Sequence, residues 1–126
     1  MGTDSHGALT TASLATTLSA QGQYEEAAAM MRQTWDVQRR VLGAEHPGTL
    51  TTASNLAYAL YRQGQLDEAA AMARQALDVQ RRVLGAKHPN TLGTAKRLAV
   101  ILRARNIAHL SLVVLFAVFL ACLLFL

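Results

Sequence analysis

Two long segments of this chain have nearly the same sequence. LATTLSAQGQYEEAAAMMRQTWDVQRRVL begins at Leu14, and LAYALYRQGQLDEAAAMARQALDVQRRVL begins at Leu56. From Leu14 to Leu50, about 26 of 37 positions match the residue about 42 places further on, and self-similarity at a fixed period is typical of repeat proteins. Each copy continues into Gly-Ala-x-His-Pro-x-Thr-Leu, beginning at Gly43 and Gly85. The chain is therefore expected to consist of stacked copies of one structural unit.

The composition favours helices and excludes several classes of protein. Alanine and leucine are abundant, aromatics make up 6% of the 126 residues, and there are only two prolines, which predicts an all-α fold rather than a β-sandwich or barrel. The single cysteine, Cys122, excludes an internal disulfide framework and argues against a cysteine-based metal site. The net charge of +4 comes mostly from arginines spread along helices, without a continuous basic block or interleaved aromatics. This pattern indicates solvated helix faces and no nucleic-acid partner.

Each unit should contain two helices. The expected helices span about residues 9–20 and 24–42 in the first copy, and 47–63 and 66–84 in the second. Gly22 and Gly64 break the first helix of each pair, and Gly43 and Gly85 follow the second, because glycine adopts positive φ at low cost. Acidic residues stand in the first turn of each second helix and arginine pairs in the last, which complements the helix dipole.

The apolar residues of the second helices predict which side packs inward. The expected buried positions are Ala27, Met30, Met31, Thr34, Val37 and Val41 in the first copy, and Ala69, Met72, Ala73, Ala76, Val79 and Val83 in the second. Leu14 and Leu56 are expected to be buried at equivalent positions of the first helices. Ala15 should face Ala27, and Ala57 should face Ala69, since alanines allow two helix backbones to approach closely.

At these residues the chain resembles the tetratricopeptide repeat, over about residues 9–105. The pattern Leu56-Ala57, Leu60, Gly64, Ala69 and Ala76 fits the signature positions of that repeat. The period of about 42 residues and the His-Pro-x-Thr-Leu joint resemble the repeats of kinesin light chains in particular. The resemblance implies a short solenoid of antiparallel helical hairpins that binds other proteins. It leaves any association with a motor open.

A third unit begins at Pro89 and then departs from the pattern. Where a turn is expected, the chain reads Arg103-Ala104-Arg105-Asn106, followed by IAHLSLVVLFAVFLACLLFL without a charged residue. Twenty helical residues span about 30 Å, the thickness of the hydrocarbon core of a bilayer. Because basic residues lie only before this segment, the positive-inside rule predicts cytoplasmic repeats and a tail anchor, Ile107 to Leu126, that crosses the membrane. Two alternatives stay open: the tail is the second helix of the third unit, packed on the second unit or on another copy, or it is a misread gene product.

The sequence therefore divides into a lead-in over residues 1–8, about two and a half repeats over residues 9–105, and a hydrophobic C-terminal helix over residues 106–126. No phosphate-binding loop, nucleophile elbow or His-Glu-x-x-His motif occurs, so we expect no enzyme, cofactor or metal. His46 and His88 occupy the same repeat position before prolines, and we interpret them as loop or capping residues rather than metal ligands.

In such repeats the first helix of each unit lines the concave, ligand-binding side. If the resemblance applies residue by residue, the candidate peptide-binding residues are Ser54, Asn55, Tyr58, Tyr61 and Arg62 in the second unit, and Lys96, Arg97, Val100 and Arg103 in the third. Asn55 could pair with a peptide backbone, the tyrosines offer apolar area with a polar tip, and the cations favour acidic segments. The alternative is that these are ordinary solvated residues, or that the cations contact lipid headgroups.

The leading hypothesis is a membrane-tethered adaptor that captures a peptide of a partner protein. The second hypothesis is a truncated or oligomerising fragment of a larger kinesin-light-chain-like protein, in which the repeats serve assembly only. With so few units, we expect a marginally stable domain unless the tail, a membrane or a second copy covers its open end. The partner, the membrane and the oligomeric state, including a homo-oligomer, are left open.

Overall fold

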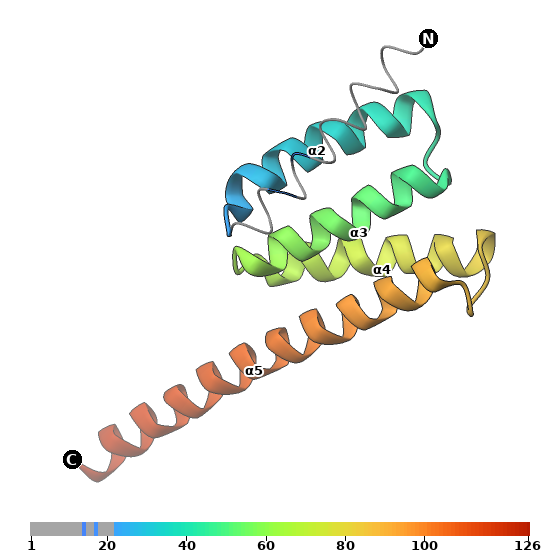
Figure 1. Cartoon of the computed structure of the whole chain (residues 1–126). Helices are drawn as coiled ribbons and strands as arrows, with labels where there is room; N and C mark the ends of the chain where they lie inside the picture. The colour runs from blue at the N-terminus through green and yellow to red at the C-terminus, as the bar shows by residue number, and fades with distance from the viewer. Residues whose placement is uncertain (1–13, 15–16, 18–21) are drawn as a thin grey trace.

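The computed structural model describes Leu14, Thr17 and residues 22–126. The described elements are the helices α2 (Tyr24–Val41), α3 (Pro47–Arg62), α4 (Leu66–Val83) and α5 (Pro89–Phe125). Successive helices run antiparallel and lie side by side, and α5 projects far beyond the others (Figure 1). The lead-in and nearly all of the helix expected over residues 9–20 lie outside the described residues. The boundaries of α2, α3 and α4 confirm the expected helices to within one residue at each end.

Small side chains hold the helices together. Ala27, Ala57 and Ala69 are completely buried and belong to one core that also contains Leu56 and Leu60. Because alanine adds only one methyl group beyond the backbone, α3 can pack closely between α2 and α4. The expected pairing of Ala57 and Ala69 agrees with this packing, whereas Ala15, the expected partner of Ala27, lies outside the described residues.

The buried sides of α2 and α4 agree with the expected ones except at their C-terminal ends. Val41 and Val83 were expected to be buried and are exposed, so this prediction was wrong. Gln38 and Gln80, one turn earlier, are buried instead. The helices end at these valines and the chain leaves toward the next unit, so the neighbouring helix contacts the preceding turn. In the first copy the Gln38 side chain lies beside Gly48, at the start of α3.

Leu14 also differs from its counterpart in the second unit. It is 48% exposed, whereas Leu56 is completely buried, so the expectation of an equivalent buried position was wrong for Leu14. Leu56 lies on α3, which packs against α2 on one side and α4 on the other. Burial at this repeat position is therefore not set by the local sequence alone, since the two copies carry the same leucine.

The joint between units is built by the same residues in both copies. The Nδ1 atom of His46 accepts a hydrogen bond from the Gly48 N–H at 3.0 Å, and His88 accepts one from the Asn90 N–H at 3.1 Å. Each histidine is the N-cap of the following helix, which confirms the capping interpretation. Gly43, with φ of +98°, turns the chain out of α2 in a conformation that other residues rarely adopt.

We expect His46→Ala to lower the free energy of unfolding by about 1 kcal/mol, because the substitution leaves an N–H of the first helical turn without its side-chain acceptor. His46→Asn supplies another acceptor and should retain most of that stability. Urea unfolding followed by far-UV circular dichroism would measure both. Equal losses for the two variants would contradict a capping role for His46.

The fifth helix is continuous from the third unit through the hydrophobic tail. Thr91, Thr94, Leu98 and Ile101 are buried at its N-terminal half, where it packs against α4 and α3. Beyond the ion pair between Arg105 and Asp67 of α4 (3.7 Å), the helix leaves the repeats. Its apolar part has a mean hydropathy of 2.7 over 18 residues, and none of that stretch is buried.

This course overturns one of the alternatives for the tail. Had the tail been the second helix of the third unit packed on the second unit, the chain would have turned back after Arg103. Instead, the helical hydrogen bonding of α5 continues through Asn106, because the segment contains neither glycine nor proline to stop it. The tail is thus a continuous helical extension of a repeat helix.

Candidate functional site

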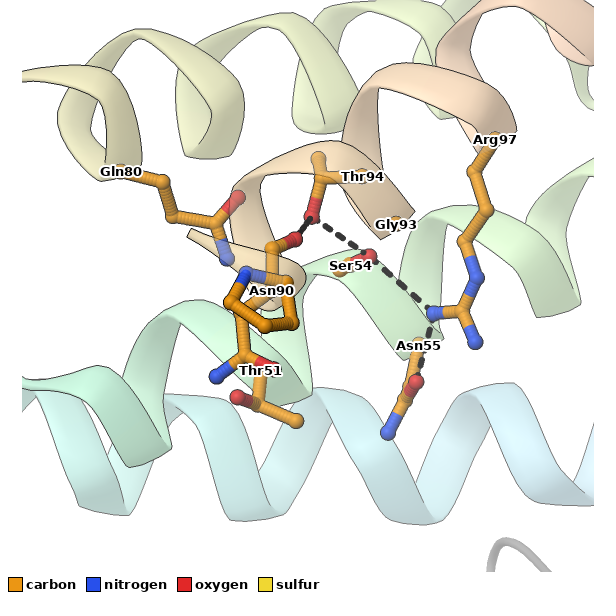
Figure 2. Close-up of a pocket in the computed structure, with 9 residues that line it drawn as sticks. Thr51, Ser54, Asn55, Gln80, Asn90, Gly93, Thr94 and Arg97 are labelled. Atoms are coloured by element: carbon orange, nitrogen blue, oxygen red, sulfur yellow. Dashed lines mark hydrogen bonds between the residues drawn. The ribbon is translucent and has the colours of Figure 1, made fainter. Parts of the chain in front are cut away.

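Arg97 of α5 is the central residue of the surface between α3 and α5. Its Nη1 atom donates to Oδ1 of Asn55 at 2.6 Å and to Oγ of Ser54 at 3.1 Å. The Thr94 hydroxyl lies 3.1 Å from the same Ser54 oxygen, and these contacts form a short polar chain across the two helices (Figure 2). Ser54 and Asn55 therefore hold the guanidinium in place.

The charge of Arg97 is partly desolvated and has no acidic partner among the described residues. Burial lowers the pKa of Arg97, while the neighbouring Tyr58 raises it. An arginine in this position remains a cation at neutral pH, since its ordinary pKa lies so high. The ion pairs between described residues involve Arg32, Arg39, Arg82 and Arg105, and not Arg97. A half-buried cation without a carboxylate is a favourable partner for an incoming acidic group.

Three tyrosines extend this surface toward the C-terminal end of α3. The ring centroids of Tyr58 and Tyr24 are 6.3 Å apart in an edge-to-face arrangement, and those of Tyr58 and Tyr61 are 5.9 Å apart. The guanidinium of Arg97 lies 5.6 Å from the Tyr58 ring, and that of Arg62 lies 4.9 Å from the Tyr24 ring. All three tyrosines are half-buried. This row, together with Arg62 and Arg97, is called the tyrosine–arginine surface below.

A hollow of about 150 Å³ lies beside Arg97. Its lining comes from α3, from the end of α4 and from the first turns of α5: Thr51, Ser54, Asn55, Gln80, Pro89, Asn90, Gly93, Thr94 and Arg97 (Figure 2). Most of these side chains are polar, and Gln80 is almost completely buried. The hollow can accept a small polar group, such as one side chain of a peptide.

The structure brings together six of the nine residues that the sequence analysis places on the binding side. Ser54, Asn55, Tyr58, Tyr61, Arg62 and Arg97 form the tyrosine–arginine surface and its support. Ser54 is 5% exposed, so it positions Arg97 and offers little surface itself. The Oδ1 atom of Asn55 is engaged by Arg97, which leaves the amide NH2 as the group that could meet a peptide.

The other three predicted residues, Lys96, Val100 and Arg103, lie apart from this cluster. Lys96 and Arg103 are exposed, and neither forms an ion pair with another described residue. Val100, which shares their side of α5 by its spacing, is 45% exposed. The two cations therefore contribute charge near the surface but are not positioned by contacts with it.

Sequence reasoning missed several residues of the site. Tyr24 occupies the position of Leu66 in the second copy. The available signal for Tyr24 was that an aromatic begins the second helix in one copy and not in the other. Thr51 lies four residues before Asn55, so the helical spacing could have placed it on the same side of α3. Gln80 gave no signal, because a glutamine near the end of a helix is ordinarily solvated.

A second hollow, of about 100 Å³, lies between α2, α3 and α4. Trp35 and Arg39 border it, with the guanidinium 4.0 Å from the indole ring, and Asp36 holds Arg39 through an ion pair. Its remaining lining is mostly apolar and includes Leu50 and Ala53. Because Arg39 is already paired and stacked, this hollow offers less for a charged ligand than the one beside Arg97.

The side chains that the site positions are of kinds that suit ligand binding. Within residues 22–126, Leu14 and Thr17, no group of three or more His, Cys, Asp or Glu side chains could hold a metal ion. Cys122, the only cysteine in the chain, lies exposed in the tail part of α5, whereas Arg97 lies in the half that packs on the repeats. The positioned groups of the site are a cation, amides, hydroxyls and aromatic rings, which recognise a ligand through hydrogen bonds, charge and stacking.

Comparisons with known proteins agree with the architecture. The family model described as tetratricopeptide repeat matches residues 7–82 and 54–106. A crystal structure of nearly identical TPR-like repeats assigned to a kinesin light chain of Podosopora anserina is similar, with 29% identity and a TM-score of 0.72 over 79% of this chain and 47% of that one. A crystal structure of a variant of the same repeats is similar at 28% identity and a TM-score of 0.68, over 87% of this chain and 52% of that one. The chain thus spans about half the length of these two structures, and no curated protein sequence matched it.

Proposed function

We propose that this chain, which belongs to the tetratricopeptide repeat family, is an adaptor that captures a peptide segment of a partner protein. The family consists of non-enzymatic interaction scaffolds, whose repeats typically bind other proteins. The tyrosine–arginine surface is the proposed docking site, and an acidic peptide is the proposed ligand.

The observation that carries this proposal is the unpaired charge of Arg97. Asn55 and Ser54 fix the orientation of its guanidinium at 2.6 Å and 3.1 Å without neutralising it. A carboxylate that reached this position would gain charge-assisted hydrogen bonds in a partly desolvated setting, where they are stronger than in water. Lys96 and Arg103, exposed on α5, would add a weaker attraction that steers acidic segments toward the surface.

The tyrosines supply the apolar part of the proposed contact. Tyr58 and Tyr61 lie against each other and against neighbouring groups, so their rings lose little additional freedom when a peptide packs on them. Such preordered aromatic area is favourable for binding, because the ordering cost is small. A peptide with an acidic residue followed by an apolar one would match the Arg97–Tyr58 pair.

We further propose that the tail anchors the chain in a membrane. Ile107 to Leu126 is long and apolar enough to cross a bilayer, no charged residue interrupts it, and none of its apolar stretch is buried by the repeats. Arg103 and Arg105 lie just before it, and this distribution supports cytoplasmic repeats. Since α5 is continuous, the repeats would stand at a fixed place relative to the membrane surface.

We expect Arg97→Leu to weaken binding of an acidic peptide by about tenfold or more, since charged hydrogen bonds contribute about 1.5 to 3 kcal/mol. A peptide array would identify a ligand, and isothermal titration calorimetry of the full chain in detergent would give the affinities. Arg81→Leu is the matched control, because Arg81 is equally cationic and exposed on α4 but does not line the hollow beside Arg97. Tyr61→Ala should also weaken binding without removing charge.

Circular dichroism of each variant separates lost binding from lost folding. If folded Arg97→Leu bound as tightly as the parent chain, or if Arg81→Leu lost as much affinity, the proposed docking site would be wrong.

A further inference from the structure

The third unit exposes an apolar side of α5 that the second unit buries on α3. Leu92 is 48% exposed, whereas Leu50, its counterpart 42 positions earlier, is 4% exposed. Ala99 is exposed, whereas its counterpart Ala57 is completely buried. In the second unit α4 packs against α3 and covers this side. The equivalent side of α5 therefore has the shape and chemistry of a helix-packing surface.

Within the described part of the chain, no helix covers that side completely. Thr91, Leu98 and Ile101 of α5 are buried against α4 and α3, and each lies one position away from a residue of the uncovered side. The segment that would form a covering helix is instead the straight continuation of α5 (Figure 1). A helix from outside the described residues would be needed to bury it.

The uncovered side has the spacing of a coiled-coil interface. Leu92, Ala95, Ala99 and Leu102 are separated by three, four and three residues, the spacing of the a and d positions of a heptad. Leu92 and Ala99, at a positions, are exposed, while Ala95 and Leu102, at d positions, are half-buried at the edge of the repeat core. A partner helix would therefore complete the burial that the core begins.

Counted onward at the same spacing through the tail, which is apolar on every side, the a and d positions reach position 123. The residues at the a and d positions from 92 to 123 are called the α5 seam below. In its tail part the apolar a and d residues are Val113, Phe116, Leu120 and Leu123, all exposed. One continuous seam thus joins the repeat half of α5 to its membrane half.

The middle of the α5 seam is polar. Asn106 occupies the a position between the repeat half and the tail half, and His109 occupies the next d position. A single asparagine at an a position pairs with its own counterpart in a parallel pair of helices, and in this way it fixes both register and pairing. Both side chains are exposed in the single chain.

We propose that the α5 seam joins two copies of this chain, with the two α5 helices parallel and in register. A second copy fits better than an unrelated partner because the seam carries no charged side chain and matches itself at every position. The parallel direction also agrees with the proposed membrane anchor, since two inserted tails would have the same orientation. This argument for the direction rests on the proposed anchor. Ala95 and Ala99 would allow the helices to approach closely.

The pairing leaves the peptide-binding surfaces free. Arg97 and Thr94 contact α3, on a side of α5 away from Ala99, so the second copy would not cover the tyrosine–arginine surface. Two such surfaces in one dimer would bind a partner with two copies of the recognised peptide more tightly than either surface alone, because the second contact becomes intramolecular.

The test is disulfide cross-linking of the full chain in detergent, with Cys122→Ser as the background. Ala99→Cys places a thiol at an a position, where counterparts in a parallel pair lie close enough to form a disulfide. Val100→Cys is the matched control: it is the next residue, 45% exposed, and off the seam. On mild oxidation we expect the Ala99→Cys band to shift from 13.6 kDa to the dimer position and the Val100→Cys band to stay.

Sedimentation in density-matched detergent gives an independent readout. Ala99→Arg would place two like charges against each other and should convert the dimer to monomer, while Val100→Arg should leave the dimer intact. Equal cross-linking at both positions, a monomeric parent chain, or a dimer that survives Ala99→Arg would each overturn the proposal. Because detergent solution does not require insertion into a bilayer, these results are separate from those on membrane anchoring.

Discussion

Leu56→Ala is expected to lower the free energy of unfolding by about 3 kcal/mol or more, which would melt the repeats at a temperature about 15 °C lower. Leu56 is completely buried on α3 between α2 and α4, in a core lined largely by alanines. Alanines cannot move far to fill a cavity, so the space left by the leucine would remain. A small domain has a total stability of only about 5 to 15 kcal/mol, and this loss is a large part of it.

Thermal unfolding by circular dichroism would measure this effect. Leu42→Ala serves as the control, because it makes the same chemical change at a leucine that is 41% exposed at the end of α2. The control should cost less than about 1 kcal/mol. Similar losses for the two variants would show that α3 is not the centre of the core.

Deletion of residues 107–126 is expected to release the chain from membranes completely. In cells expressing the full chain, carbonate extraction should leave it in the membrane pellet, because a segment of this length and hydropathy inserts across the bilayer. The deleted chain should move to the soluble fraction. The repeats end their contacts near Arg105, so the deletion removes no buried residue.

A substitution within the tail tests the same point without changing its length. Val114→Arg, near the middle of the segment, adds a cost of about 3 kcal/mol to insertion and should reduce the pelleted fraction, whereas Val114→Leu should not. Recovery of the full chain in the carbonate supernatant would contradict an anchor and would leave the apolar tail as an assembly element.

The helical hairpins could be predicted from the sequence because each signal is local. A proline at the first turn of α3 and α5, acidic residues early and arginines late in α2 and α4, and a glycine after the last turn mark these helices independently of the rest of the chain. Because the unit is repeated, each of these signals occurs in both copies. For that reason the ends of α2, α3 and α4 agree with the expected ones to within a residue.

Other features depend on what packs against a residue, and the sequence does not state this. Val41 and Val83 continue the apolar series of their helices but lie in a turn that no described neighbour covers, so they are exposed. Leu14 and Leu56 occupy the same repeat position and differ in burial. The continuous helix through Asn106 was likewise hidden, since the repeat pattern predicted a turn there.

The candidate site was predicted as a set of residues but not as an arrangement. The resemblance to the tetratricopeptide repeat placed Asn55, Tyr58 and Arg62 on one helix and Arg97 on another. It could not show that Arg97 would bind Asn55 and Ser54, because a contact over 42 or 43 positions depends on how two units stack. The pairing adds support of a cation, through Oδ1, to the peptide contact expected of Asn55.

The central claim, that the surface between α3 and α5 receives a partner peptide, is tested most directly by hydrogen–deuterium exchange. The full chain in detergent would be compared with and without the tightest peptide from the array. We predict slower exchange in α3 and in the first turns of α5, around Tyr58 and Arg97, with α2 beyond Trp35 unchanged. Protection confined to the Trp35 side, or exchange unaffected by a peptide that binds, would contradict the account.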